Sequence, residues 1–373
     1  MNVPKLRFKE FNDEWSFTEL AKISSDISYG MGLASKEYDG VNKYIRITDI
    51  DEKTNKYSNK DIVSPDGVLE DKYLVNKNDI LFARTGASTG KTYLYDEKDG
   101  KLYFAGFLIR ANIINHDANF IFQQTKTNKY NKWVKIMSMR SGQPGINSQE
   151  YGSYKFSITS PEEEEKISKT LNLLDKKIEL QTKKIEDLKL FKLCTAKIIF
   201  KDNSLLCKKQ LKELCNIVKG KQINSEFLSE TGEYYMLNGG INPSGFINEY
   251  NTNENTISIS EGGNSCGYVN FNKSKFWAGG HCYTITPIDI NNIYLYQILK
   301  YNENKIMDLR VGSGLPNIQK KDLENFSINV HHSNMQNKIA TILSSIDKLI
   351  DLEEKKINNI EKLKKGLMQN MFV

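Results

Sequence analysis

The sequence predicts an α+β protein in which two α/β domains are joined by two long helices that form an antiparallel coiled coil. Residues 142–200 return, after a shift of 172 positions, as residues 314–372, with 15 identities and no gap. Both copies contain a long run with apolar residues at coiled-coil spacing, and a segment of short strand-like patterns precedes each run. Matching seams in one chain most simply pack against each other, so the order domain, helix, domain, helix predicts two domains related by a pseudo-twofold axis.

Composition limits the possible functions without choosing one. The chain has 373 residues, enough for two or three domains, and its net charge of +6 is compatible with a nucleic-acid partner but does not require one. The five cysteines form no C-x-x-C pair and the four histidines lack metal-ligand spacing, so we expect free thiols and no metal site. The N-terminus has no apolar leader and no run reaches 18 apolar residues. We therefore expect a cytoplasmic protein that does not enter a membrane.

Residues 1–160 are predicted to form the first domain. Residues 44–48, 79–84 and 91–95 are rich in β-branched and aromatic side chains and are separated by Gly, Asn and Asp, which indicates short strands. Residues 120–139 have the pattern of one helix.

Residues 161–200 are predicted to form a central spacer helix. Pro161 fits a first helical turn, and Glu162–Glu165 complement the positive end of the helix dipole. We expect this acidic run to be a solvated helix start. Gln181 interrupts the apolar seam where a further apolar residue would be expected. The seam consists of Ile167, Leu171, Leu174, Ile178, Ile185 and Leu188.

Residues 201–332 are predicted to form the second domain and residues 333–373 the C-terminal spacer helix. The repeat extends into the domains, because residues 78–90 align with 255–267 and YFAG at 103–106 aligns with FWAG at 276–279. Glu353 interrupts the second seam at the position of Gln181. This seam consists of Ile339, Leu343, Ile346, Ile350, Ile357 and Ile360.

Four features follow one another along essentially the whole chain. They are the N-terminal PKLRFKEFNDEW, the hairpin NDILFARTGASTGK, the paired segments SGQPGIN and SGLPNIQ, and a long helix after each domain. In this order they resemble the specificity subunit of type I restriction-modification enzymes.

The resemblance implies a non-catalytic DNA reader. Each domain would be a target recognition domain for one half of a bipartite, asymmetric duplex site, and the helices would set the gap between the halves. The subunit would recruit two methylation subunits and the restriction/translocase subunits. S-adenosylmethionine, ATP and Mg²⁺ would belong to those partners, with no cofactor in this chain.

The segment from Arg84 to Thr92 is the first candidate for contact with DNA. GKT after an apolar strand suggests a phosphate-binding P-loop, but the P-loop pattern needs Gly at the position of Thr85, and the aligned copy EGGNSCGYV lacks both Lys and Thr. A glycine-rich hairpin fits better. It is either a turn alone or a loop that places Arg84, Ser88 and Lys91 against phosphates or base edges.

Other candidates lie where the two aligned domains differ most and before the Gly-Pro segments. Arg pairs with guanine and Asn with adenine in the major groove, although each of these residues also fits an ordinary solvated loop. The arginines before the Gly-Pro segments could instead stabilise a helix C-terminus. The candidates are Arg46, Thr48 and Arg140 in the first domain and Asn238, Asn242, Ser244, Asn264 and Arg310 in the second.

Two other functions compete with DNA recognition. A structural adaptor, with two β-rich protein-binding domains on a coiled coil, is compatible with the modest charge, and a P-loop enzyme would bind ATP. The sequence contains no G-x-G-x-x-G opening a βαβ unit, no N-P-P-[FYW] methyltransferase signature and no helicase or nuclease motif. We therefore expect no catalysis by this chain alone. His281 is expected to be a partly buried structural histidine.

Overall fold

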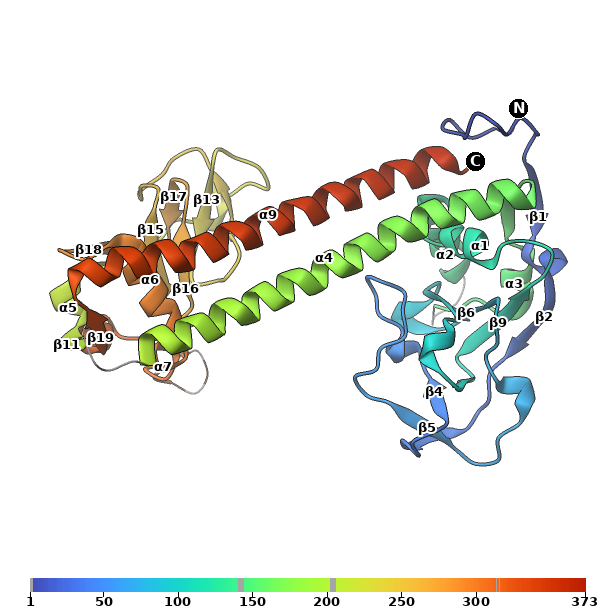
Figure 1. Ribbon diagram of the computed structural model, residues 1–373, viewed down its shortest axis with the longest axis horizontal. Helices are drawn as coiled ribbons and strands as arrows, with labels where there is room; N and C mark the ends of the chain where they lie inside the picture. The colour runs from blue at the N-terminus through green and yellow to red at the C-terminus, as the bar shows by residue number, and fades with distance from the viewer. Residues whose placement is uncertain (1–2, 140–143, 202–205, 313, 315) are drawn as a thin grey trace. The chain divides into compact units, whose positions relative to one another are not determined.

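The computed structural model describes residues 3–139, 144–201, 206–312, 314 and 316–373. It divides into two compact units, Met1–Leu180 with Ile357–Val373 and Gln181–Lys356 (Figure 1). Each unit contains one α/β domain together with one end of each long helix. The mixed α/β domains and the two long helices confirm the predicted fold class.

The first domain is built on a four-stranded antiparallel sheet with the order β2-β9-β6-β7. Of its two central strands, β6 is buried along its whole length, and Ile80–Ala83 within it are all apolar. The strands are β2 (Ser24–Tyr29), β9 (Leu108–Ile113), β6 (Asp79–Ala83) and β7 (Thr92–Leu94).

The second domain repeats this sheet as β12-β18-β15-β16. In the first sheet Ile109 pairs with both Tyr29 and Phe82. In the second sheet Tyr283 pairs with both Lys219 and Ile259. Because Phe82 aligns with Ile259, Tyr29 and Lys219 occupy equivalent positions. The strands are β12 (Cys215–Lys219), β18 (Cys282–Pro287), β15 (Thr256–Ser260) and β16 (Val269–Asn272).

Smaller strand pairs complete each domain. Antiparallel β1-β10 corresponds to β11-β19, and the parallel pair β4-β8 corresponds to β13-β17. The pair β3-β5 belongs to the first domain, and β14 adds a strand beside β13 in the second. Their bounds are β1 (Ser16–Glu19), β3 (Ala34–Glu37), β4 (Lys43–Ile45), β5 (Val63–Asp66), β8 (Leu102–Phe104), β10 (Lys155–Ile158), β11 (Leu206–Gln210), β13 (Tyr234–Leu237), β14 (Gly245–Ile247), β17 (Phe276–Ala278) and β19 (Ser327–His331).

Short helices cover the sheets, and one prediction about them is wrong. The expected single helix at residues 120–139 is two helices, α1 and α2, because Thr127 caps α2 through its side chain and the chain turns between them. The helices are α1 (Ala118–Gln124), α2 (Asn128–Ser138), α3 (Ser148–Ser153), α5 (Leu211–Leu214), α6 (Asn292–Tyr301), α7 (Glu303–Met307) and α8 (Lys320–Asn325). Single 3₁₀ turns are η1 (Leu20–Ile23), η2 (Ile47–Asp49), η3 (Asp71–Tyr73), η4 (Gly86–Ser88), η5 (Glu97–Asp99) and η6 (Ser225–Phe227).

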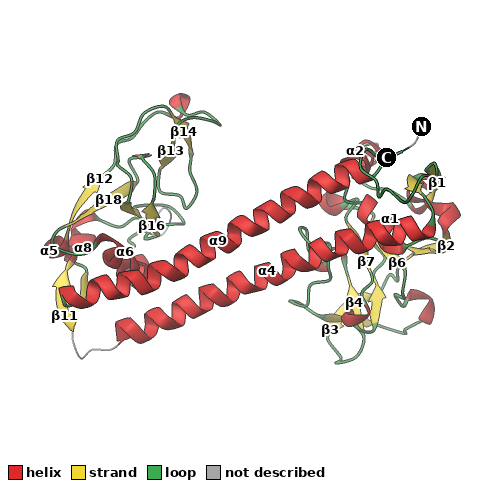
Figure 2. Ribbon diagram, turned by 45° about the horizontal axis from the view of Figure 1, so that its top comes forward, coloured by secondary structure: helices red, strands yellow, loops and turns green. Residues whose placement is uncertain are grey.

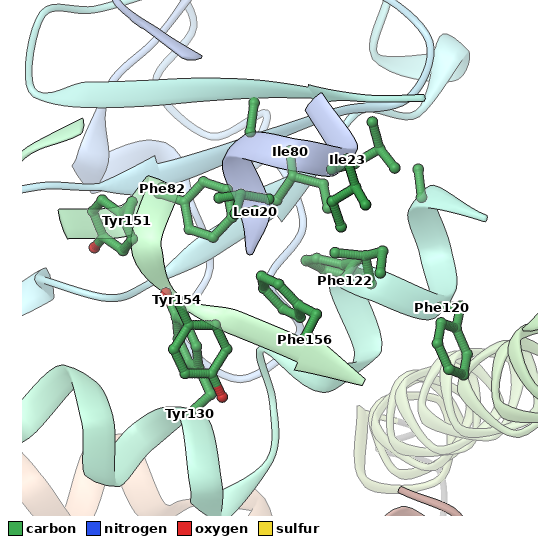
Figure 3. Packing of buried hydrophobic residues seen from close by; sticks show 14 of the residues in the cluster. Leu20, Ile23, Ile80, Phe82, Phe120, Phe122, Tyr130, Tyr151, Tyr154 and Phe156 are labelled. Atoms are coloured by element: carbon green, nitrogen blue, oxygen red, sulfur yellow. The ribbon is translucent and has the colours of Figure 1, made fainter. Parts of the chain in front are cut away.

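An aromatic core joins the first sheet to its helices. Figure 3 shows Phe82 of β6 close to Tyr151 of α3, and Tyr130 of α2 close to Tyr154. Phe120 of α1 packs against Phe372, near the C-terminus, with 5.4 Å between the two ring centroids. Burial of a large aromatic side chain stabilises a fold by roughly 2–3 kcal/mol, so this core fixes the sheet, the helices and the helix ends as one body.

The long helices are α4 (Pro161–Lys201) and α9 (Ser333–Met371), drawn in red in Figure 2. In unit 1 the early α4 residue Asp175 contacts Lys364, late in α9. In unit 2 the late α4 residue Lys192 contacts Asp347, early in α9. The helices are therefore antiparallel in both units.

None of the twelve predicted seam residues is exposed. Ile167 and Leu171 belong to the aromatic core of the first domain, so the beginning of this seam anchors the domain. The buried residues are Ile167, Leu171, Ile185, Ile339, Leu343, Ile346 and Ile350; the half-buried ones are Leu174, Ile178, Leu188, Ile357 and Ile360.

The acidic start of α4 is only partly the solvated run that we expected, since Glu162 and Glu165 are exposed. Glu163 and Glu164 are completely buried. Glu163 receives two hydrogen bonds of 2.7 Å from Arg7 and one of 3.2 Å from Trp15 Nε1. Glu164 lies 2.9 Å from His116 Nδ1 and accepts a bond from the backbone N–H of Asp117. These carboxylates attach the N-terminal segment and the start of α1 to α4.

Candidate nucleic-acid interface

The glycine-rich segment of the first domain is a hairpin loop between the antiparallel strands β6 and β7. Ala83 exchanges backbone hydrogen bonds of 2.8 and 2.9 Å with Lys91 and Gly90, and η4 fills the turn. A P-loop instead joins a strand to a helix, so this geometry excludes a P-loop here.

Gly90 shows why the loop needs glycine. Its φ of +88° favours a residue without a Cβ, and an added Cβ would lie 2.4 Å from Val134. The buried hydroxyls of Tyr151 and Tyr130 hold this position, since Gly90 N donates to Tyr151 and Gly90 O accepts from Tyr130, both at 3.1 Å. The loop is therefore fixed to the aromatic core at its base.

The second domain builds the same loop between β15 and β16. Ser260 exchanges backbone hydrogen bonds of 3.0 and 2.8 Å with Tyr268 and Gly267, and Gly267 has φ of +90°. An added Cβ on Gly267 would meet Met307 at 2.8 Å. The frame of the loop is thus shared by both domains.

The described parts of the two Gly-Pro segments, from Pro144 and from Pro316 onward, line these loops. Pro144 O accepts a bond of 3.1 Å from Gly86 N, and Pro316 O accepts one of 3.0 Å from Gly263 N. Isolated bridges between Thr85 and Gly145 and between Gly262 and Asn317 extend this pairing in the two domains.

Arg84 directly follows β6 on this loop and stacks on Tyr29, with 4.8 Å from its guanidinium carbon to the ring centroid. Its backbone N donates to Phe107 O at 3.0 Å, and its backbone O accepts from Ile146 N at 2.9 Å. Among the described residues, its side chain donates only a long 3.4 Å bond, to Gly106 O. The backbone of Arg84 is fixed, while most of its guanidinium N–H groups have no partner among the residues that the structure describes.

Ser88 and Lys91 lie on the same loop, but the Lys91 side chain already contacts other residues of the first domain. Its ammonium group lies 3.2 Å from Ile50 O and 3.4 Å from the Glu52 carboxylate. Ser88 is half-buried at the end of η4, and its carbonyl accepts from Lys91 N.

Arg46 is bound within its own turn. The predicted strand at 44–48 ends at Ile45, and η2 follows. Both Nε and Nη2 of Arg46 donate to the Asp49 carboxylate, at 2.9 and 2.8 Å, which raises the pKa of the guanidinium. This pair would have to open before Arg46 could read a base. Thr48 is exposed beside it.

The candidates of the second domain fall into two groups. Asn238 adjoins the glycine-rich loop, because its Oδ1 accepts from His281 N at 3.1 Å and the neighbouring Gly239 O accepts from Ser260 Oγ at 2.6 Å. Asn264 is exposed on the loop itself. The exposed residues Asn242 and Ser244 lie in the connection from β13 to β14.

The two arginines before the Gly-Pro segments differ in what can be said of them. Arg140 lies outside the described residues. Arg310 is exposed just after α7, and its backbone N donates to Met307 O at 3.2 Å. This position is compatible with stabilisation of the helix end and with contact to a phosphate.

Sequence reasoning missed the partners that surround Arg84 and its counterpart. Glu261 occupies the position of Arg84, with its backbone N bonded to His281 O and its backbone O to Ile318 N, both at 2.9 Å. Its carboxylate accepts from Lys219 at 2.6 Å and from Tyr283 at 3.0 Å. Burial, then the bond to Glu261, raises the pKa of Tyr283, which keeps this phenol a neutral donor. The alignment of 78–90 with 255–267 already placed Arg84 opposite Glu261, whereas Tyr29 and Lys219 meet them only through the sheet register.

His281 differs from its expected role. Its side chain is 61% exposed, in the turn before β18, with Nδ1 3.4 Å from Glu261 Oε2. The prediction that His281 is partly buried is therefore wrong. The neighbouring Cys282 is buried, and all five cysteines are free thiols.

The described part of the chain holds no group of three or more His, Cys, Asp or Glu side chains that could bind a metal ion. In the same residues, no helix combines the length and the apolar character needed to cross a bilayer.

The type I restriction modification DNA specificity domain matches the sequence twice, at residues 16–190 and 205–362. The chain belongs to this family. The two matches coincide with the two domain-and-helix repeats.

Individual relatives carry related names. A Mycoplasma pneumoniae protein named as a type I specificity subunit is 36% identical over 182 residues, which is 48% of each chain. A Mycoplasma genitalium protein of the same kind is 31% identical over 42% of each chain. The chain thus spans about half the length of these two curated relatives. A Methanocaldococcus jannaschii protein named as the MjaX specificity subunit is 26% identical over 98% of this chain and 95% of its own.

Solved structures support the same fold. The S subunit of a type I restriction-modification system from M. genitalium superposes with a TM-score of 0.72 at 20% identity, covering 100% of this chain and 99% of that one. A chain from a study of complex assembly and conformational transition in the type I system gives a TM-score of 0.55 at 16% identity, covering 96% and 97%.

Proposed function

We propose that this chain is the DNA sequence-specificity subunit of a type I restriction-modification system and is itself non-catalytic. Each domain reads one half of a bipartite, asymmetric duplex site. The observation that carries this proposal is the pair of loops after β6 and β15, in a chain of the DNA specificity family. Their backbones make the same hydrogen bonds, yet one carries Arg84 and the other Glu261, whose buried carboxylate is held by Lys219 and Tyr283. One frame with two chemistries suits two half-sites of different sequence.

The remaining candidates contribute in two ways under this proposal. Ser88, Arg310 and, outside the described residues, Arg140 are proposed to contact phosphates, which position a protein on duplex DNA. Thr48, Asn238, Asn242, Ser244 and Asn264 are proposed base readers, since asparagine and hydroxyl side chains bond to base edges. Arg46 and Lys91 join them only if their internal contacts open.

The outer faces of the long helices support a role in assembly. Leu180 of α4 and Leu352 of α9 occupy the same position of the repeat, are both leucine, and are 61% and 52% exposed. Phe191 and Leu363 form a second equivalent pair of exposed apolar residues. Single exposed apolar residues are common on protein surfaces, but here both copies of the repeat keep them at equivalent positions. Because the pattern occurs twice, it suits two copies of one partner, which we propose to be the methylation subunits.

Catalysis is assigned to the partners. The methylation subunits would use S-adenosylmethionine, and the restriction/translocase subunits would use ATP and Mg²⁺.

A gel-shift titration tests the proposal. The full chain is combined with its methylation subunits and a library of duplexes, and the bound fraction is sequenced. We expect enrichment of one two-part sequence, with an affinity that falls steeply with salt. Absence of duplex binding by the complete methylation complex would sink the proposal, and binding without sequence preference would favour a structural adaptor.

A further inference from the structure

Arg84 differs from the other described arginines of the first domain because no carboxylate of the described residues pairs with it. Arg7, Arg46 and Arg110 each donate to an acidic side chain, Glu163, Asp49 and Asp26 respectively, at 2.7–2.9 Å. Arg84 instead rests on the Tyr29 ring. A guanidinium stacked on an aromatic ring is oriented without using its N–H donors. Arg84 is thus preoriented for a planar acceptor that the described residues do not supply.

The second domain indicates which kind of acceptor this is. At the equivalent positions the pair of Tyr29 and Arg84 is replaced by the ion pair of Lys219 and Glu261. Phosphates occur in every DNA sequence, so an arginine that served only to bind a phosphate would be expected to have a cationic counterpart in the second domain. In the second domain Glu261 is only 9% exposed and its carboxylate accepts from Lys219 and Tyr283, so this position holds no cation that is free for a phosphate. The exchange of Arg for Glu on one shared backbone therefore favours reading of bases over binding of the DNA backbone.

We propose that Arg84, held by Tyr29, reads a guanine in the first half-site. This inference rests on the proposed function and adds the base class to it. Guanine presents O6 and N7 side by side in the major groove, and the two parallel N–H donors of a guanidinium match that pair. Phe107 is 62% exposed, and its carbonyl accepts from Arg84 N. Its ring offers an apolar contact to a neighbouring base.

The first arm of the test uses the unaltered protein. The two-part site is first determined with the wild-type methylation complex, and each guanine of the first half-site is then replaced by 7-deazaguanine, which lacks the N7 acceptor. At one position we expect binding to weaken about ten- to hundred-fold. Unchanged binding at every guanine of that half-site, or a first half-site without guanine, overturns the proposal.

The second arm uses Arg84→Lys, which keeps the charge but loses the planar fork. We expect the variant complex to lose preference for that guanine by about ten- to hundred-fold while the second half-site and the salt dependence stay as in the wild type. If Arg84 contacts a phosphate, Arg84→Lys retains the specificity, and Arg84→Gln weakens all sequences equally with a salt slope smaller by about one. That outcome would overturn base reading. Lys132→Gln, an exposed cation removed from α2, is the matched charge control.

The two proposals fail in different ways. A wild-type complex that recognises no two-part site contradicts the proposed function. A complex that recognises such a site but is indifferent to 7-deazaguanine contradicts only the role of Arg84.

Discussion

Gln181 and Glu353 hydrogen-bond to each other between α4 and α9, although they are the same position in the two copies of the repeat. Lys184 and Lys356, which are also equivalent to each other, both donate to the Glu353 carboxylate, at 2.8 and 3.1 Å. The two polar residues that interrupt the apolar seams therefore pair with each other. A polar pair within an apolar seam specifies the register of paired helices.

Glu353 makes stability depend on pH in a defined direction. Hydrogen bonds from Lys184, then Lys356, lower the pKa of its carboxyl below 4.5. A carboxyl with a lowered pKa stabilises the fold above its unfolded-state pKa, and this contribution is lost as the pH falls through the folded-state value. We expect the free energy of unfolding of Glu353→Gln to fall less than that of the wild type between about pH 6 and pH 3. Urea titrations along that range measure the difference, and Glu361→Gln, an exposed α9 variant, serves as control. Parallel profiles for Glu353→Gln and the wild type would contradict the assignment.

Asp347 ties three elements of unit 2 together. Its carboxylate accepts from Lys192 of α4 at 2.7 and 2.8 Å and from Gln297 of α6 at 2.7 Å. We expect Asp347→Ala to lower the free energy of unfolding by about 1.5–3 kcal/mol, because it removes charge-assisted bonds at a half-buried site. Glu354→Ala, which removes only a surface partner of Lys189, should cost less than about 1 kcal/mol. Equal costs in denaturant titrations would show that Asp347 is an ordinary surface acid.

Glu163 gives the largest stability effect that we expect. Its removal leaves Arg7, whose side chain is only 10% exposed, without its partner. Loss of one member of a buried ion pair costs about 3–5 kcal/mol. Glu163→Ala should therefore lower the free energy of unfolding by that amount. The exposed neighbour Glu162 provides a matched control, since Glu162→Ala should change it by less than about 0.5 kcal/mol. A loss below 1 kcal/mol for Glu163→Ala would mean that the N-terminal segment is not attached through this pair.

The free thiols should differ in reactivity. Cys194 and Cys207 are exposed, whereas burial raises the pKa of Cys215 and of Cys282 to about 12. The thiolate is the reactive form, so the two exposed cysteines should react rapidly with a disulfide reagent and the buried ones only after unfolding. Stopped-flow labelling without urea counts the exposed cysteines, and labelling in urea counts the exposed and the buried ones together. Rapid reaction of Cys282 in the folded protein would contradict the buried position of β18.

Periodicity and duplication were strong predictors of the fold because they are repeated over many residues. The seams from Ile167 to Leu188 and from Ile339 to Ile360 predicted two long helices. The prediction of one helix at residues 120–139 was wrong because the apolar pattern continues from α1 into α2. The break between these helices depends on one residue, the N-cap Thr127.

The candidate site was harder to predict because its members meet through pairing between distant strands. Tyr29 reaches Arg84 only through the register of β2, β9 and β6, which a linear alignment does not contain. The burial of Glu163 was missed for a similar reason. An acidic run at a helix start usually faces water, and only the distant residues Arg7 and Trp15 make its burial favourable.

Methylome sequencing tests the central claim most directly. A host that lacks other adenine methylation is given this chain together with its methylation subunit, and methylated adenines are mapped across the genome. The proposed function predicts one methylated motif made of two different specified parts separated by a fixed number of unspecified base pairs. Methylation at a continuous motif, at two identical half-sites, or equally with and without this chain would contradict it.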